Sequence, residues 1–78
     1  MRHDESKYSV TVGQGQATIR KRGESQLRTG QILGREVQDG LQVIYLDRLL
    51  LPPGETELRD GWTATGCIST ILTGPLAA

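Results

Sequence analysis

Apolar and polar residues alternate in two neighbouring segments near the start of the chain, 8–12 (YSVTV) and 16–20 (QATIR). Alternation with a period of two places the apolar side chains on one face of a strand and the polar ones on the other. The sequence Gly13-Gln14-Gly15 between the two segments is typical of a tight turn. The pattern therefore predicts a β-hairpin.

A second hairpin is predicted from residues 27–37 and 41–47, the latter being the most apolar stretch of the chain. Asp39-Gly40 between them suits a two-residue turn, because both residue types tolerate the positive φ that such a turn requires. Gly30 and Gly34 interrupt the first strand. Glycine inside a strand indicates a bulge or a sharp bend, so we expect this strand to be strongly bent.

The pattern changes after the second hairpin. Leu46, Leu49 and Leu50 have the spacing of one helical turn, which Pro52 and Pro53 would end. Further on, 62–65 and 68–72 are rich in β-forming residues, and Asp60-Gly61 predicts another turn. We expect one short helical turn in 46–51 and strands on either side of it.

Ten glycines divide the chain into segments of the length found in small β domains. The predicted fold is all-β, with five to six short strands. It is either a small, strongly bent antiparallel barrel of the SH3-like kind or a compact sandwich. We expect one β domain over residues 7–73, a flexible N-terminal segment over 1–6 and a loose C-terminal tail over 74–78.

Composition limits how this domain is stabilised. The chain has 78 residues and no Phe, so its core is small and its stability marginal. Cys67 is the only cysteine and His3 the only histidine. An intrachain disulfide and a Cys/His metal site are therefore excluded, and oligomerisation is the remaining compensation.

A contact surface is predicted where three leucines follow one another. Successive side chains of a strand point to opposite faces, so one thin layer does not cover Leu49, Leu50 and Leu51 together. Trp62, in the uncharged stretch that ends the chain, is a candidate anchor. These four residues are the predicted protein interface of a homo-oligomer, most simply a dimer, or of a contact with another protein.

Charge suggests an alternative function. Residues 1–36 carry seven basic and four acidic side chains, whereas residues 37–78 carry two basic and five acidic ones. Basic side chains near the predicted hairpin tip are suited to binding phosphates. The candidates for nucleic-acid binding are Arg20, Lys21, Arg22, Arg28 and Arg35. Net charge is zero and only Tyr8 is aromatic in the basic half, so this alternative ranks second to protein binding.

Little in the sequence indicates catalysis. His3 lies in a polar end, and Cys67 has no charged neighbour that would favour the thiolate, so we expect a buried, inert thiol. Glu55 and Glu57 share a face if that segment is extended, which is typical of a solvated edge. Gly13-Gln14-Gly15 is followed by neither the lysine nor the helix of a phosphate-binding loop. We expect no enzyme activity, no cofactor and no metal.

The chain has no apolar run long enough for a membrane span and no apolar core of a signal peptide near its start. A cytoplasmic location is therefore expected. Taken together, the sequence predicts a small non-catalytic binding or assembly module.

Overall fold

Seven antiparallel strands form the protein in the computed structural model, which describes residues 6–76. They are β1 (Tyr8–Val12), β2 (Gln16–Lys21), β3 (Leu27–Gln38), β4 (Leu41–Leu46), β5 (Gly54–Glu57), β6 (Thr63–Gly66) and β7 (Thr70–Pro75). Strands make up 61% of the described residues, and the one short helical element among them is the turn η2 (Arg59–Gly61). The all-β prediction is confirmed, with seven strands where the sequence predicted five to six.

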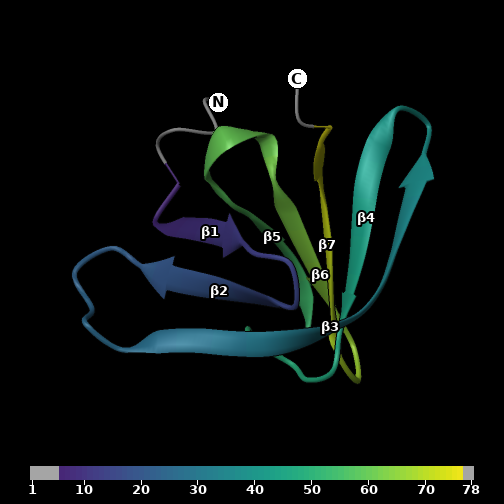
Figure 1. Ribbon diagram of the computed structural model, residues 1–78. Helices are drawn as coiled ribbons and strands as arrows, with labels where there is room; N and C mark the ends of the chain where they lie inside the picture. Colours follow the sequence, from purple (N-terminus) through teal and green to yellow (C-terminus); the bar gives the residue numbers. More distant parts are fainter. Residues whose placement is uncertain (1–5, 77–78) are drawn as a thin grey trace.

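The strands follow the order β1-β2-β3-β4-β7-β6-β5 and curl into a half-barrel. In Figure 1, β1 and β2 lie on one side, the β3–β4 hairpin rises on the other, and β5, β6 and β7 lie between them. Both predicted hairpins are present. Asp39 and Gly40 have φ of 54° and 78°, the positive values expected for their turn.

Strand β3 is bent and belongs to both sides of the half-barrel. It pairs with β2 through residues 27–31 and with β4 through residues 32–38, and its register shifts between Ile32 and Gly34. This confirms the bend expected from the two glycines. At Gly30, an added Cβ would lie only 3.4 Å from Leu46 Cβ and from Leu50 Cδ2. Glycine there lets β3 pass close to the chain that follows β4.

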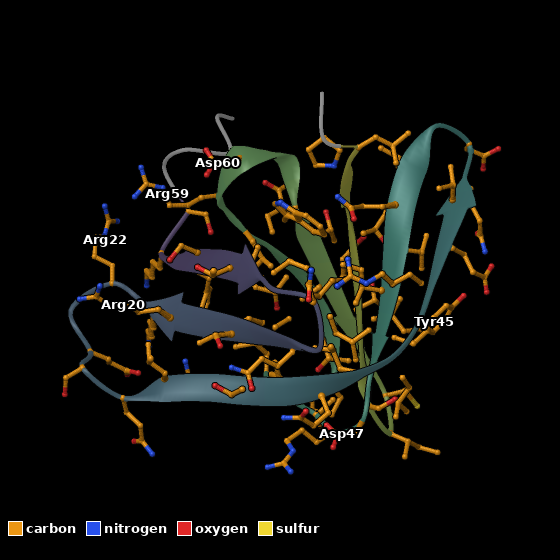
Figure 2. The ribbon with its side chains drawn as sticks, in the orientation of Figure 1. Arg20, Arg22, Tyr45, Asp47, Arg59 and Asp60 are labelled. Atoms are coloured by element: carbon orange, nitrogen blue, oxygen red, sulfur yellow. The ribbon has the colours of Figure 1, made fainter. Side chains whose placement is uncertain are left out.

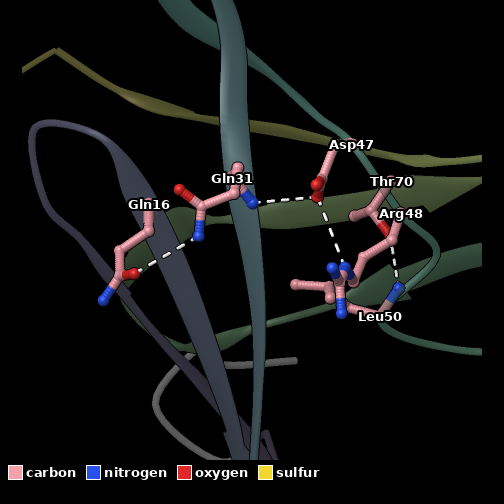
Figure 3. A network of polar contacts seen from close by, with 6 residues as sticks. All are labelled: Gln16, Gln31, Asp47, Arg48, Leu50 and Thr70. Carbon is pink, nitrogen blue, oxygen red and sulfur yellow. Dashed lines mark hydrogen bonds and ion pairs between the residues drawn. The ribbon is translucent and has the colours of Figure 1, made fainter.

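Polar contacts fix the chain at this crossing (Figure 3). Gln31 N–H donates to Asp47 Oδ1 at 2.9 Å, and Asp47 N–H donates to Gln31 O at 3.0 Å. Arg48 Nε lies 3.4 Å from the same Asp47 Oδ1. Leu50 N–H donates to the buried Thr70 Oγ1 at 2.8 Å, and Thr70 N–H donates to Arg48 O. The contacts join β3, the loop after β4 and the start of β7.

The helical turn predicted in residues 46–51 is wrong. Leu46 ends β4, and residues 47–51 are irregular chain held by the contacts just described. An irregular segment has no fixed face, so Leu50 and Leu51 both turn inward. Leu46, Leu49 and Leu50 therefore have helical spacing without forming a helix, because Leu46 ends a strand and the other two lie in a loop.

The core lies inside the curl of the sheet. Its largest fully buried apolar side chains come from β2, β4, β7 and the residue that follows β5: Ile19, Ile44, Leu46, Leu72 and Leu58. Trp62 packs at one margin of this core, opposite Gly74. A Cβ on Gly74 would lie 2.2 Å from the indole ring, so the ring lies directly on the glycine backbone.

The structure describes part of each terminal segment that the sequence set apart from the domain, namely residue 6 and residues 74–76. Ser6 Oγ donates to Glu57 O at 2.7 Å, and β7 continues to Pro75. The expectations for residues 1–5 and 77–78 lie outside the described residues. No helix within residues 6–76 has the length and apolar character that crossing a membrane requires.

Candidate anion-binding site

Four cationic side chains gather at one end of the half-barrel. They are Lys7 before β1, Arg20 on β2, Arg22 in the turn after β2 and Arg59 on η2. With Ser6, Ser9 and Gly23 they line a cleft of about 240 Å³, called here the cationic cleft. Figure 2 shows Arg20, Arg22 and Arg59 at the same end of the molecule.

Strand pairing explains most of this gathering. Arg22 N–H donates to Lys7 O at 2.7 Å, which extends the β1–β2 ladder and places these two residues opposite each other. Two pairs further along, and therefore on the same face, Ser9 lies opposite Arg20. Gly23, which also lines the cleft, has φ of 88°, a backbone conformation that favours glycine.

Arg59 comes to the cleft from a distant part of the sequence. η2 packs against β1, and the hydrogen bond from Ser6 to Glu57 O ties the start of β1 to the end of β5. Asp60 and Gly61 have φ of 62° and 84°, so the connection from β5 to β6 is tight. This tight connection keeps Arg59 over the start of β1.

The four cationic side chains of the cleft differ from the other described basic residues in having no partner within residues 6–76. Within residues 6–76, none of its four cationic side chains forms an ion pair or hydrogen bond with a described residue, and no carboxylate lines the cleft. The exposed Asp60 is the nearest acidic residue along the chain and lies beside Arg59 in Figure 2. The remaining described basic residues are all partnered: Lys21 and Arg28 with Glu24, Arg48 with Asp47, and Arg35 with backbone carbonyls.

The five basic residues that the sequence predicted for nucleic-acid binding do not all lie together in the structure. Arg20 and Arg22 lie in the cationic cleft. Lys21 is 3.9 Å from Glu24 and points to the opposite face from Arg20. Arg28 also pairs with Glu24 and lies 5.9 Å from the centre of the Tyr8 ring.

Arg35 lies away from the cleft and has a different role. Its Nη2 donates to the carbonyl oxygens of Gly13 and Gln14, the latter at 2.9 Å. Arg35 thus ties β3 to the β1–β2 turn. Sequence reasoning missed Lys7 and Arg59. A signal existed only for Lys7, which directly precedes the first predicted strand.

The predicted protein interface lies largely inside the fold. Leu50 and Leu51 are only 7% and 6% exposed, and Leu49 is half-buried against Gly66. Trp62 is half-buried on Gly74. These positions leave little of the four side chains for a partner to contact.

Other apolar side chains are exposed, mostly around the β3–β4 hairpin. Leu33 and Val37 on β3 are 71% and 65% exposed, and Leu41 on β4 and Leu76 after β7 are exposed too. Val37 and Leu76 line one shallow hollow, whereas Leu41 pairs with Gln38 and faces the other side of the hairpin. We call Val37 and Leu76 the apolar hairpin patch. Beyond Gln31, β3 has a paired strand on one side only, so residues 33–38 also form a free strand edge.

Groups for catalysis or metal binding do not come together in the described part of the chain. Cys67 is exposed, so the expectation of a buried thiol is wrong: residues 67–69 form the turn between β6 and β7 and cannot reach the core. Glu55 and Glu57 share the outer face of β5, as expected. Residues 6–76 contain no group of three or more His, Cys, Asp or Glu side chains placed to hold a metal ion.

Tyr45 is the one described group with a resolved shift in acidity. A hydrogen bond to Glu36 raises the pKa of the Tyr45 phenol above 10.0, and burial and the negative charge of Glu36 act in the same direction. Gln38 opposes this shift through a hydrogen bond of its own. Tyr45 lies on β4, far along the sheet from the cationic cleft (Figure 2).

Comparison with known proteins found no matching family model, no matching curated protein and no matching solved structure. Function is therefore inferred from the residues of the chain itself.

Proposed function

We propose that this chain is a small non-catalytic binding module whose cationic cleft holds the phosphate groups of a nucleic acid. One observation carries the proposal: four of the eight described basic residues converge on one cleft without an acidic partner among the described residues. Like charges held together repel one another, and a bound anion removes that repulsion. Nucleic acid therefore ranks ahead of protein binding, because two of the leucines predicted to contact a protein, Leu50 and Leu51, lie in the core.

The chemistry of the cleft suits phosphate. Guanidinium groups form paired hydrogen bonds with phosphate oxygens, and the cleft holds three of them beside one ammonium group. Its volume of about 240 Å³ lies below the range of roughly 300–1,000 Å³ of small-molecule pockets, which are mostly apolar. A polymer that passes over the surface fits these features better than an enclosed substrate or cofactor.

The proposal is tested by replacing Arg20 and Arg22 together with Gln and measuring binding of a fluorescently labelled nucleic acid by anisotropy at low salt. We expect affinity to fall about tenfold or more, because each charge-assisted hydrogen bond contributes roughly 1.5–3 kcal/mol. The matched control replaces Lys21 and Arg48, which lie outside the cleft, with Gln. Equal losses in both variants would leave the cleft without a special role.

Assembly through protein–protein contacts is the second candidate function. The apolar hairpin patch favours it, because exposed apolar side chains next to a free strand edge are a template for pairing with another chain. A second copy of the chain is the proposed partner, in a two-fold dimer. A cytoplasmic location belongs to the same proposal, since the exposed Cys67 suits a reducing compartment.

A further inference from the structure

A second surface continues directly from the cationic cleft, and it bears on which nucleic acid the proposed function would serve. Ser9, Thr11, Thr18, Arg20 and Leu27 line a shallow hollow on the outer face of β1, β2 and the first part of β3. Ser9 and Arg20 also line the cationic cleft, so the two hollows are contiguous.

Three of the five residues that line this second hollow, Ser9, Thr11 and Thr18, carry hydroxyl groups. Thr11 lies opposite Thr18, and Thr18 lies opposite Thr29, so the three threonines form a row across the strands. Thr18 Oγ1 and Thr29 Oγ1 are 3.1 Å apart and share a hydrogen bond. We call Ser9, Thr11, Thr18 and Thr29 the hydroxyl strip. Hydroxyl groups, like the cations beside them, are donors that bind phosphate oxygens.

Aromatic side chains are missing from this surface. The chain has three aromatic residues, all described. Tyr8 packs against the core from the inner face of β1, Trp62 lies on Gly74, and Tyr45 is on β4. Proteins that bind single-stranded nucleic acids usually stack the bases on aromatic rings, and this surface has no aromatic ring.

We infer that the ligand of the cationic cleft is a double-stranded nucleic acid, held by its phosphate backbone across the cleft and the hydroxyl strip without reading the bases. The inference rests on the proposed function and names its ligand class. A duplex presents regularly spaced phosphates outside and keeps its bases stacked within, so it needs no aromatic platform. Three neighbouring β-strands span about 10 Å, a length of duplex axis along which each nucleic-acid strand carries about three phosphates, at one per 3.4 Å of axis.

The experiment compares two labelled duplexes of unrelated sequence with their separated single strands, by anisotropy over a range of salt concentrations. We expect the duplexes to bind within about threefold of each other and at least about tenfold tighter than the single strands. The slope of log K against log salt should be about −3, at roughly −0.9 for each neutralised phosphate. Inorganic phosphate, added at constant ionic strength, should not displace the duplex, because it contacts only one subsite.

The outcomes separate the inference from the proposed function. Three results would overturn the inference while leaving an anion-binding cleft. They are single-stranded nucleic acids that bind as tightly as duplexes, a preference above tenfold for one duplex sequence, and displacement of the duplex by inorganic phosphate. No binding of any nucleic acid would overturn both.

A variant tests the hydroxyl strip directly. Thr11→Val keeps the shape and β propensity of the exposed side chain and removes its hydroxyl. We expect it to weaken duplex binding two- to threefold, and Thr65→Val, a matched exposed control on β6, to have no effect. An unchanged affinity for Thr11→Val would remove the strip from the contact surface.

Discussion

Single residues set how closely neighbouring segments approach in this fold, and Gly74 is the clearest case. The Trp62 ring occupies the space that any side chain at Gly74 would need, at 2.2 Å from the added Cβ. We expect Gly74→Ala to lower the free energy of unfolding by about 1–3 kcal/mol through overpacking. Urea denaturation measures this. Gly15→Ala is the control, because nothing lies within 4 Å of its added Cβ, and an equal loss there would contradict the account.

Tyr45 gives a prediction about acidity. In a Tyr8→Phe background only the Tyr45 phenol titrates, and its absorbance change at alkaline pH should report a pKa above 10.0. Glu36→Gln should move that pKa down, because it removes the negative charge and the acceptor that favour the neutral phenol. Because the folded-state pKa is raised, this group's contribution to stability is present below pH 10 and is lost as pH rises through the folded-state value. An unmoved pKa in Glu36→Gln would show that Glu36 is not the cause.

Among the structural elements, the hairpins were predictable from the sequence and their closure into a half-barrel was not. The β1–β2 and β3–β4 pairs depend on adjacent segments and on turn residues such as Asp39-Gly40, which act locally. The pairing of β4 with β7 depends on contacts between segments distant in the sequence, which no local pattern encodes. The buried loop that carries Leu50 and Leu51 was not predictable for the same reason. Hydrogen bonds to Gln31 and Thr70 hold this loop in place, and the spacing of its leucines does not encode those bonds.

In the candidate site, too, only the residues that lie close together in the sequence were predictable. Arg20 and Arg22 were identified because they are close together in the sequence beside a predicted turn. Arg59 was missed because only the packing of η2 against β1 brings it to the cleft. Arg28 and Arg35 were included because sequence does not reveal that Glu24 and two carbonyl groups already engage them.

Arg35 supplies a prediction at the level of elements, because it joins β3 to the β1–β2 turn. Arg35→Gln should lower the free energy of unfolding by about 1–3 kcal/mol, since two carbonyl groups lose a charged donor. It should leave the affinity for nucleic acid unchanged under conditions where the variant is folded. Thermal denaturation and anisotropy on the same sample measure both effects. Weakened binding by a fully stable variant would mean that Arg35 contacts the ligand.

For the whole molecule, self-association is tested at the apolar hairpin patch. If two copies pair there, sedimentation equilibrium at micromolar concentration should give twice the mass of 8.5 kDa, and Val37→Lys should restore the monomer. Ile68→Lys is the matched control, because Ile68 is 90% exposed but lies in the β6–β7 turn. A monomeric wild type would end this proposal, and dissociation by both variants would place the contact elsewhere. Whether the half-barrel is of the SH3-like kind stays a prediction.

The central claim is that Lys7, Arg20, Arg22 and Arg59 act together on phosphate, and its most direct test uses the two residues that the sequence did not reveal. Nucleic-acid affinity is measured across salt concentrations for the wild type, for Lys7→Gln/Arg59→Gln and for the control Lys21→Gln/Arg48→Gln. The account predicts that the first variant binds more weakly and that its salt slope is smaller in magnitude by about two, while the control keeps the wild-type slope. A slope unchanged by loss of Lys7 and Arg59, or reduced equally by the control, would contradict it.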